Sequence, residues 1–192
     1  MKKVAVFIFL LILSLQTFAQ VEQKFNLTYT GDKELWCSIE DKDGNYELTL
    51  QTTNTNSTCV YILSNTDDII KFHEAMKNLK AKWLEYREIA IKNKVDDFVK
   101  KVDIEFPRMT LAWYWSEWYS GPRSKPEIFF SIQNGYYIMD IYKESASRTN
   151  SYIKEKADLI LISEIDFDTL ISLSDISNIK KKLSEDISEL FK

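Results

Sequence analysis

Histidine and cysteine are scarce in this 192-residue chain, which has one of the first and two of the second. A dense Cys/His metal cluster is therefore excluded, and we predict no metal and no cofactor. Only 4 Gly and 3 Pro are present, which excludes collagen-like and low-complexity chains. The motifs of the common serine hydrolases and of Gly-rich phosphate loops are also missing, so the sequence favours a non-catalytic protein.

Hydrophobic residues are plentiful by contrast, at 45% of the chain, beside 28% charged and 14% aromatic residues. This composition supports a sizeable buried core. No repeat of fixed period and no long linker divides the chain, so we expect residues 20–192 to form a single domain.

The first residues have the three parts of a secretory signal. Lys2 and Lys3 precede an apolar run over 4–15, and Thr17 and Ala19 are the small residues that a signal peptidase requires. We predict cleavage between Ala19 and Gln20, and hence a periplasmic or secreted bacterial protein. The competing interpretation is an uncleaved anchor, but a helix that spans a bilayer needs ~20 apolar residues and this run is shorter.

Loss of the two signal lysines changes the formal net charge from −4 to −6. An acidic chain is repelled by nucleic acid and by anionic lipid, so we predict neither as a partner. No later segment is long and apolar enough to predict a membrane span after cleavage.

Two periodicities predict the fold class. Alternation of apolar and polar residues predicts strands over 25–30, 35–39, 46–50 and 58–63, and later over 102–106, 109–115, 128–132, 136–142 and 159–162, with a long loop over 144–156. Apolar steps of three and four predict one long helix over about 67–94, capped by Asn65 or Thr66, and helices over about 166–192 with a break near 172–175. The predicted fold is α+β, a mostly antiparallel sheet with the long helix packed across it and C-terminal helices.

The two cysteines can form one disulfide. An exported chain meets oxidising conditions, in which Cys37 and Cys59 are expected to pair, although two buried free thiols are the alternative. In a plain three-stranded meander these residues lie on the first and third strands, about 9–10 Å apart, whereas a disulfide needs Cα atoms within about 7 Å. A disulfide therefore requires that the third strand pair next to the first, or that the sheet be frayed at one cysteine.

The segment 113–119 contains three of the five tryptophans. Trp113 and Trp115 share a predicted strand face with apolar residues and are expected in the core. Exposed Trp, Tyr and Arg dominate binding hot spots. The predicted binding residues therefore lie on the other face, at the strand end and in the following loop: Tyr114, Trp118, Tyr119 and Arg123. The alternative is that helices cover this face as well.

Three functions are compatible with these features. The first is an exported non-catalytic binding protein, such as an inhibitor, an immunity-type protein or an envelope interaction module, with an unidentified protein partner. The second is a carbohydrate-binding module that stacks a glycan on the aromatic residues of 114–119. The third is an exported hydrolase that uses carboxylates, with Glu117 as the candidate acid. We expect His73, at the edge of the long helix's apolar stripe, to be structural.

Overall fold

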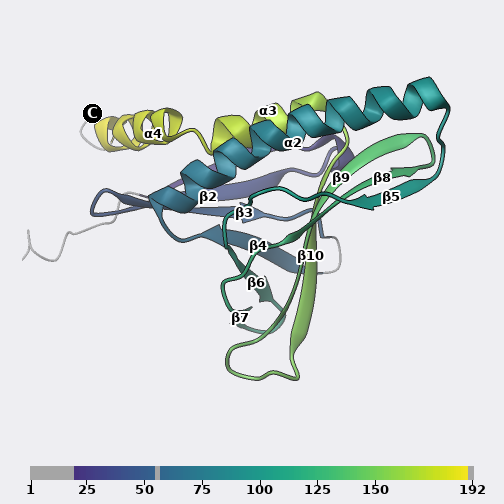
Figure 1. Cartoon of the computed structure of the whole chain (residues 1–192). Helices are drawn as coiled ribbons and strands as arrows, with labels where there is room; N and C mark the ends of the chain where they lie inside the picture. The colour runs from purple at the N-terminus through teal and green to yellow at the C-terminus, as the bar shows by residue number, and fades with distance from the viewer. Residues whose placement is uncertain (1–19, 55–56, 190–192) are drawn as a thin grey trace, which may run out of the picture.

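The computed structural model describes residues 20–54 and 57–189, arranged as Figure 1 shows. The predicted signal peptide, with its cleavage site after Ala19, lies outside these residues, and so do positions 190–192 of the predicted C-terminal helices. The described residues have the predicted α+β fold, in which one long helix lies across antiparallel strands.

The strands form two antiparallel sheets, where the sequence suggested one. Their strand orders are β1-β2-β3-β4-β6-β7 and β10-β9-β8-β5. The first sheet contains β1 (Gln20–Phe25), β2 (Leu35–Lys42), β3 (Asn45–Gln51), β4 (Thr58–Leu63), β6 (Thr110–Tyr114) and β7 (Trp118–Ser120). The second contains β5 (Phe98–Lys101), β8 (Glu127–Gln133), β9 (Tyr136–Ala146) and β10 (Lys154–Leu161).

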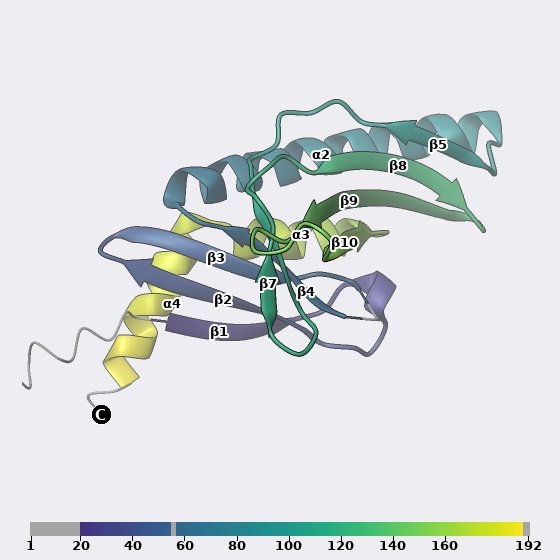
Figure 2. The same cartoon turned by 90° about the horizontal axis from the view of Figure 1, so that it is seen from below.

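Helix α2 (Thr66–Asn93) confirms the long helix. The Asn65 side chain caps it by accepting a hydrogen bond from the Asp68 N–H at 2.9 Å, and the helix ends before Lys94, which is in the left-handed conformation. Figures 1 and 2 show α2 running over both sheets. Its predicted apolar stripe faces them, and one buried cluster contains side chains from α2 and from both sheets.

The C-terminal segment forms two helices, with the break where it was predicted: α3 (Glu164–Leu173) and α4 (Ile176–Glu189). Helix α3 lies beside α2, and Lys80 pairs with Asp168 across this contact at 2.8 Å. His73 is part-buried in the same contact, with Nδ1 3.0 Å from the Ile171 carbonyl oxygen. A carbonyl oxygen can only accept, so Nδ1 carries the proton and donates it. No helix of the described ranges is long and apolar enough to cross a membrane.

Two strand predictions were wrong, and one loop prediction was wrong at its boundaries. Residues 25–30 are not a strand, because β1 ends at Phe25 and Thr28–Thr30 form the 3-10 helix η1. Residues 102–106 are not a strand either, and β5 precedes them. Val102 and Phe106 still bury their side chains, and the Val102 N–H donates to the Ile128 carbonyl of β8 at 2.8 Å, so the alternation there reflects packing beyond the point where strand pairing ends. The expected loop over 144–156 is shorter, since β9 extends to Ala146 and β10 begins at Lys154.

The predicted disulfide is wrong, because Cys37 and Cys59 are both free and buried. Cys37 lies on β2 and Cys59 on β4, and β3 lies between these strands. Two strand spacings are about 9–10 Å, which exceeds the reach of a disulfide. Because β3 lies between the two cysteine-bearing strands, the cysteines stay too far apart to bond. The alternative prediction, two buried free thiols, is therefore confirmed.

We expect these thiols to be unreactive in the folded chain and to react once it unfolds. Burial raises the pKa of Cys37 to about 11 and also raises the pKa of Cys59, so little reactive thiolate is present near pH 8. Titration with a chromogenic disulfide reagent, under non-reducing conditions, should detect essentially no thiol before guanidinium is added and both thiols afterwards. Absence of thiol in the unfolded chain would instead indicate a disulfide.

The connection between β3 and β4 covers the outer edge of β10. The Thr53 N–H and O–H both donate to the Asp158 carbonyl, at 2.9 and 2.6 Å, and Thr53 Oγ1 accepts from the Ile160 N–H at 3.3 Å. The Asn54 amide donates to the Lys156 carbonyl at 2.8 Å and accepts from the Asp158 N–H at 2.9 Å. These polar contacts join the first sheet to the second.

A buried carboxylate ties the start of the chain to α3. Asp166 is fully buried, and its Oδ1 accepts from both the N–H and the O–H of Thr28 at 2.7 Å. Its Oδ2 accepts from the N–H groups of Ile162 and Ser163, at 2.8 and 2.9 Å. The Ser163 hydroxyl accepts in return from the Asp166 N–H, which completes a capping box. The single carboxylate thus receives four hydrogen bonds.

Candidate functional site

Residues 110–120, which we call the aromatic hairpin, present aromatic side chains to solvent. Tyr114 on β6 and Trp118 on β7 are register partners, with ring centroids 5.6 Å apart, and are 45% and 54% exposed. Alternation along the strands places both on the face of the first sheet that points away from the core. These two predicted binding residues therefore lie together on one surface.

The other aromatic residues of the hairpin are arranged differently. Trp113 is fully buried, as expected, and its ring stacks on that of part-buried Tyr119 at 6.1 Å. The prediction that Trp115 lies in the core is wrong, since this side chain is 50% exposed. β6 ends at Tyr114, and the Trp115 N–H bonds to the Glu117 carbonyl in the turn, so the strand alternation stops before Trp115.

The fourth predicted binding residue, Arg123, contacts the start of α2. Its guanidinium forms an ion pair with Asp68, in the first turn of the helix, and donates to the Arg108 carbonyl at 3.2 Å. These bonds engage the guanidinium within the protein, so Arg123 positions the loop after β7 and is not grouped with Tyr114 and Trp118.

A shallow groove of about 310 Å³ adjoins Trp118 on the outer face of the first sheet, and we call it the outer groove. It is mainly apolar, because Val60, Ile62 and Ala112 form its floor between Trp36 and Trp118. The lining is completed by Thr49, Tyr119 and Ser120. Alternation in β2, β3, β4 and β6 turns the lining residues of these four strands outward while their neighbours enter the core.

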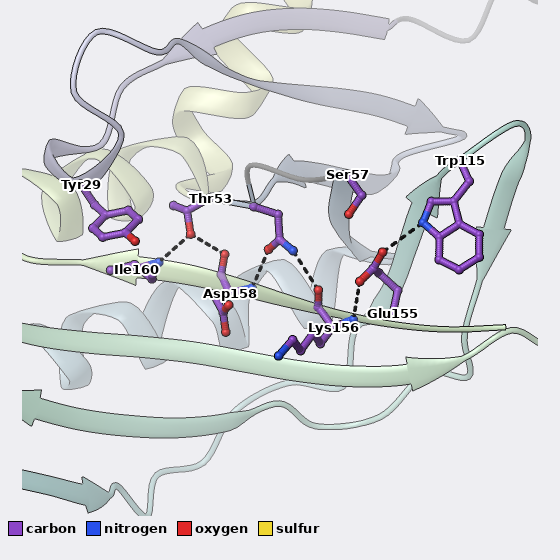
Figure 3. A pocket seen from close by; sticks show the side chains of 9 residues that line it. Tyr29, Thr53, Ser57, Trp115, Glu155, Lys156, Asp158 and Ile160 are labelled. Carbon is purple, nitrogen blue, oxygen red and sulfur yellow. Dashed lines mark hydrogen bonds between the residues drawn. The ribbon is translucent and has the colours of Figure 1, made fainter. Parts of the chain in front are cut away.

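A second hollow, the polar pocket, has a volume of about 380 Å³ and lies beside β10 (Figure 3). Tyr29 of η1 and Trp115 of the hairpin stand at its two ends. Between them lie residues of β10 and of the β3–β4 connection: Thr53, Asn54, Ser57, Glu155, Lys156, Asp158 and Ile160. The Glu155 carboxylate is held in place by the Trp115 indole N–H, at 3.1 Å, and by the Lys156 N–H, at 3.0 Å.

Two carboxyl groups lie diagonally on neighbouring strands at this side of the second sheet. Asp140 of β9 is the register partner of Ile160, two positions from Asp158 on β10. Burial, with a further contribution from the negative charge of Asp158, raises the pKa of Asp140 to about 7, and burial also raises the pKa of Asp158. Asp140 Oδ1 is buried without a hydrogen-bond partner in the described chain. Near neutral pH, therefore, Asp140 is partly protonated.

Lys143 is an unusual feature of the core. It is 2% exposed, and its ammonium donates to the carbonyl oxygen of Ser124, at 3.2 Å, and to the Ser124 hydroxyl. Within residues 20–54 and 57–189 it has no carboxylate partner, and burial lowers its pKa to about 8. This lysine lines neither the outer groove nor the polar pocket.

Within the described residues, the side chains that could act as a catalytic acid or bind a metal do not lie together at one site. Glu117 is exposed in the hairpin turn, where its carboxylate accepts a hydrogen bond from the Tyr119 hydroxyl and thereby raises the pKa of Tyr119. It lines neither hollow. No group of three or more metal-ligating side chains occurs in the part of the chain that the structure describes.

Sequence reasoning missed most of the polar pocket. Tyr29, Thr53 and Asn54 come from an early segment, whereas Glu155 and Asp158 follow about a hundred residues later. Glu155 and Asp158 are three positions apart, so the alternation of β10 could have indicated that their side chains start from opposite faces of the strand. No local pattern, however, indicates which segment covers the edge of that strand. Comparison with models of known protein families, with curated proteins and with solved structures finds no match.

Proposed function

We propose that this chain is an exported, non-catalytic binding protein that holds a protein partner on the outer groove. The observation that carries the proposal is the position of Trp118, which is half exposed at the side of a shallow groove with an apolar lining. Large aromatic side chains beside an apolar patch are the usual anchors of protein interfaces, because the partner removes both from water.

The charges around the groove indicate the chemistry of the partner. On the outer faces of β1–β3, Lys42 lies between Glu40 and Glu47, 3.1 Å from each, and Glu22 is nearby on β1. Lys24 pairs with Glu34 at 2.5 Å. Among these charged side chains of β1–β3 and of the loop before β2, none of which lines the groove, four are carboxylates and two are ammonium groups. A partner with an apolar centre and a basic rim complements this surface.

Trp118→Ala is expected to weaken the complex by about 5- to 30-fold, the range for a residue that contributes about 1–2 kcal/mol at the centre of an interface. The full chain, tagged at its C-terminus, should be expressed in its own cells and captured from the envelope and secreted fractions. The enriched protein should then be purified and its affinity measured for both forms at two salt concentrations. Because the rim is acidic, affinity should fall as salt rises.

The matched control is Tyr136→Ala, since Tyr136 is 58% exposed on the β8–β9 hairpin and lies outside the groove. It should leave the affinity unchanged. Equal loss with both variants, or capture of a glycan in place of a protein, would contradict the proposal. The mass of the captured chain tests export separately, because cleavage after Ala19 leaves Gln20 as the first residue.

A further inference from the structure

The polar pocket has aromatic walls and a polar floor. Tyr29 and Trp115 are 48% and 50% exposed at its two ends, and the intervening floor is formed by β10 (Figure 3). The faces of aromatic rings are electronegative and attract polarised C–H groups. A ligand that suits this pocket therefore has an apolar C–H face as well as groups that form hydrogen bonds.

Several polar groups of the pocket are available to such a ligand. The Asp158 carboxylate, the Lys156 ammonium and the Tyr29 hydroxyl have no hydrogen bond or ion pair to any residue within 20–54 and 57–189. The neighbouring side chains are already held: Thr53 and Asn54 bond to the β10 backbone, and Glu155 bonds to Trp115. The pocket thus combines free donors and acceptors with a rigid frame, as sites for small polar molecules do.

The charges select against anionic ligands. Among the described lining residues, Glu155 and Asp158 contribute two carboxylates and Lys156 the only ammonium, while Lys33, which does not line the pocket, donates to the Asn54 carbonyl at 3.3 Å. A carboxylate, sulfate or phosphate group on the ligand would therefore meet net repulsion. The volume, about 380 Å³, is at the lower end of the ~300–1,000 Å³ range of small-molecule sites, which suits one or two sugar rings.

We propose that the polar pocket binds an uncharged saccharide unit, which packs its C–H face on Trp115 and directs its hydroxyls to Lys156 and Asp158. Trp115 turns toward Glu155 and the pocket, whereas Trp118 lines the outer groove. The saccharide site and the protein-binding surface are therefore separate, and either can fail without the other.

The test is titration of the purified full chain with uncharged oligosaccharides and with one acidic oligosaccharide. The uncharged probes are cello-, malto-, manno- and N-acetylchito-oligosaccharides, and the acidic probe is oligogalacturonate. Calorimetry should detect at least one uncharged probe, bound at least fivefold more tightly than the acidic one. Trp115→Ala should weaken that binding by about fivefold or more, as loss of an aromatic anchor does.

Two further variants distinguish the loss of a contact with the saccharide from a loss of folding. Trp115→Phe keeps a ring in the pocket and should retain most of the affinity, and Trp118→Ala should leave it unchanged because Trp118 lies in the outer groove. Unfolding midpoints of all three variants provide the check on folding. The proposal is overturned if no uncharged probe binds, if the acidic probe binds best, or if Trp118→Ala weakens binding as much as Trp115→Ala does.

Discussion

Replacing Asp166 with alanine is expected to lower the free energy of unfolding by about 3–5 kcal/mol, because it leaves buried donors without an acceptor. Three backbone N–H groups and the Thr28 hydroxyl all donate to this fully buried carboxylate. Each unsatisfied buried donor costs about 1–3 kcal/mol, and the cap of α3 is lost as well. A domain has a free energy of unfolding of only about 5–15 kcal/mol, so Asp166→Ala is expected to remove a large part of it.

Two further variants, Asp166→Asn and Asp168→Ala, test whether the loss of stability comes from the Asp166 carboxylate. The Asp166→Asn substitution keeps the size of the side chain, but it places an NH₂ group against donors where an oxygen now accepts, so we expect most of the loss to remain. Asp168 is exposed and pairs with Lys80, and loss of an exposed ion pair costs at most about 1 kcal/mol. Urea unfolding of the three variants measures these differences. A loss below about 1 kcal/mol for Asp166→Ala would contradict the role of the carboxylate.

Lys143→Met is expected to stabilise the chain at pH 7 by on the order of 2–3 kcal/mol, because an ammonium group is buried without a counter-charge. Burial lowers the pKa of Lys143 from 10.5 to about 8. Below pH 8 both the folded and the unfolded lysine are charged, and the folded chain bears the full desolvation cost. Between about pH 8 and pH 10.5 only the unfolded chain binds this proton, so the stability of the wild-type chain rises with pH.

The advantage of Lys143→Met should therefore be greatest below pH 8 and disappear near pH 10.5. The Ser124 carbonyl keeps its bond from the Met109 N–H, at 3.0 Å, so the substitution leaves it satisfied. Urea unfolding of both chains at intervals from pH 7 to pH 10 isolates the effect, because Cys37 and Tyr61 titrate equally in both. Lys125→Met, at an exposed lysine, is the control. A variant less stable than the wild type at every pH would refute this account.

The features that could be predicted from the sequence are those with a local cause. Asn65 caps α2 through a bond to a backbone N–H three residues away, and Asn134-Gly135 forms its tight turn because both residues adopt positive φ. The strands on either side of that turn follow from alternation. Such signals need only a short window of sequence, which explains why the helices and most hairpins were predicted.

The features that could not be predicted depend on distant segments. Val102 and Phe106 alternate like strand residues, and the Val102 N–H still donates to the Ile128 carbonyl at 2.8 Å, but β8 begins at Glu127 and offers no strand partner to the residues that follow. Trp115 continues the alternation of β6 in sequence, although the turn begins there. The polar pocket exists only because Thr53 meets Asp158, 105 positions along the chain. No spacing in the sequence contains that information.

The coverage of β10 by Thr53 and Asn54 has a consequence for self-association. A strand at the end of a sheet presents open N–H and C=O groups to which a strand of another molecule can add, and chains that add in this way build dimers and fibres. Here the hydroxyl and amide of two side chains already bond to those groups on β10. At the opposite end of the same sheet, β5 is exposed but carries Lys100 and Lys101, whose charges repel an identical strand. Addition of a strand from another molecule is therefore opposed at one edge of the second sheet by hydrogen bonds and at the other edge by charge.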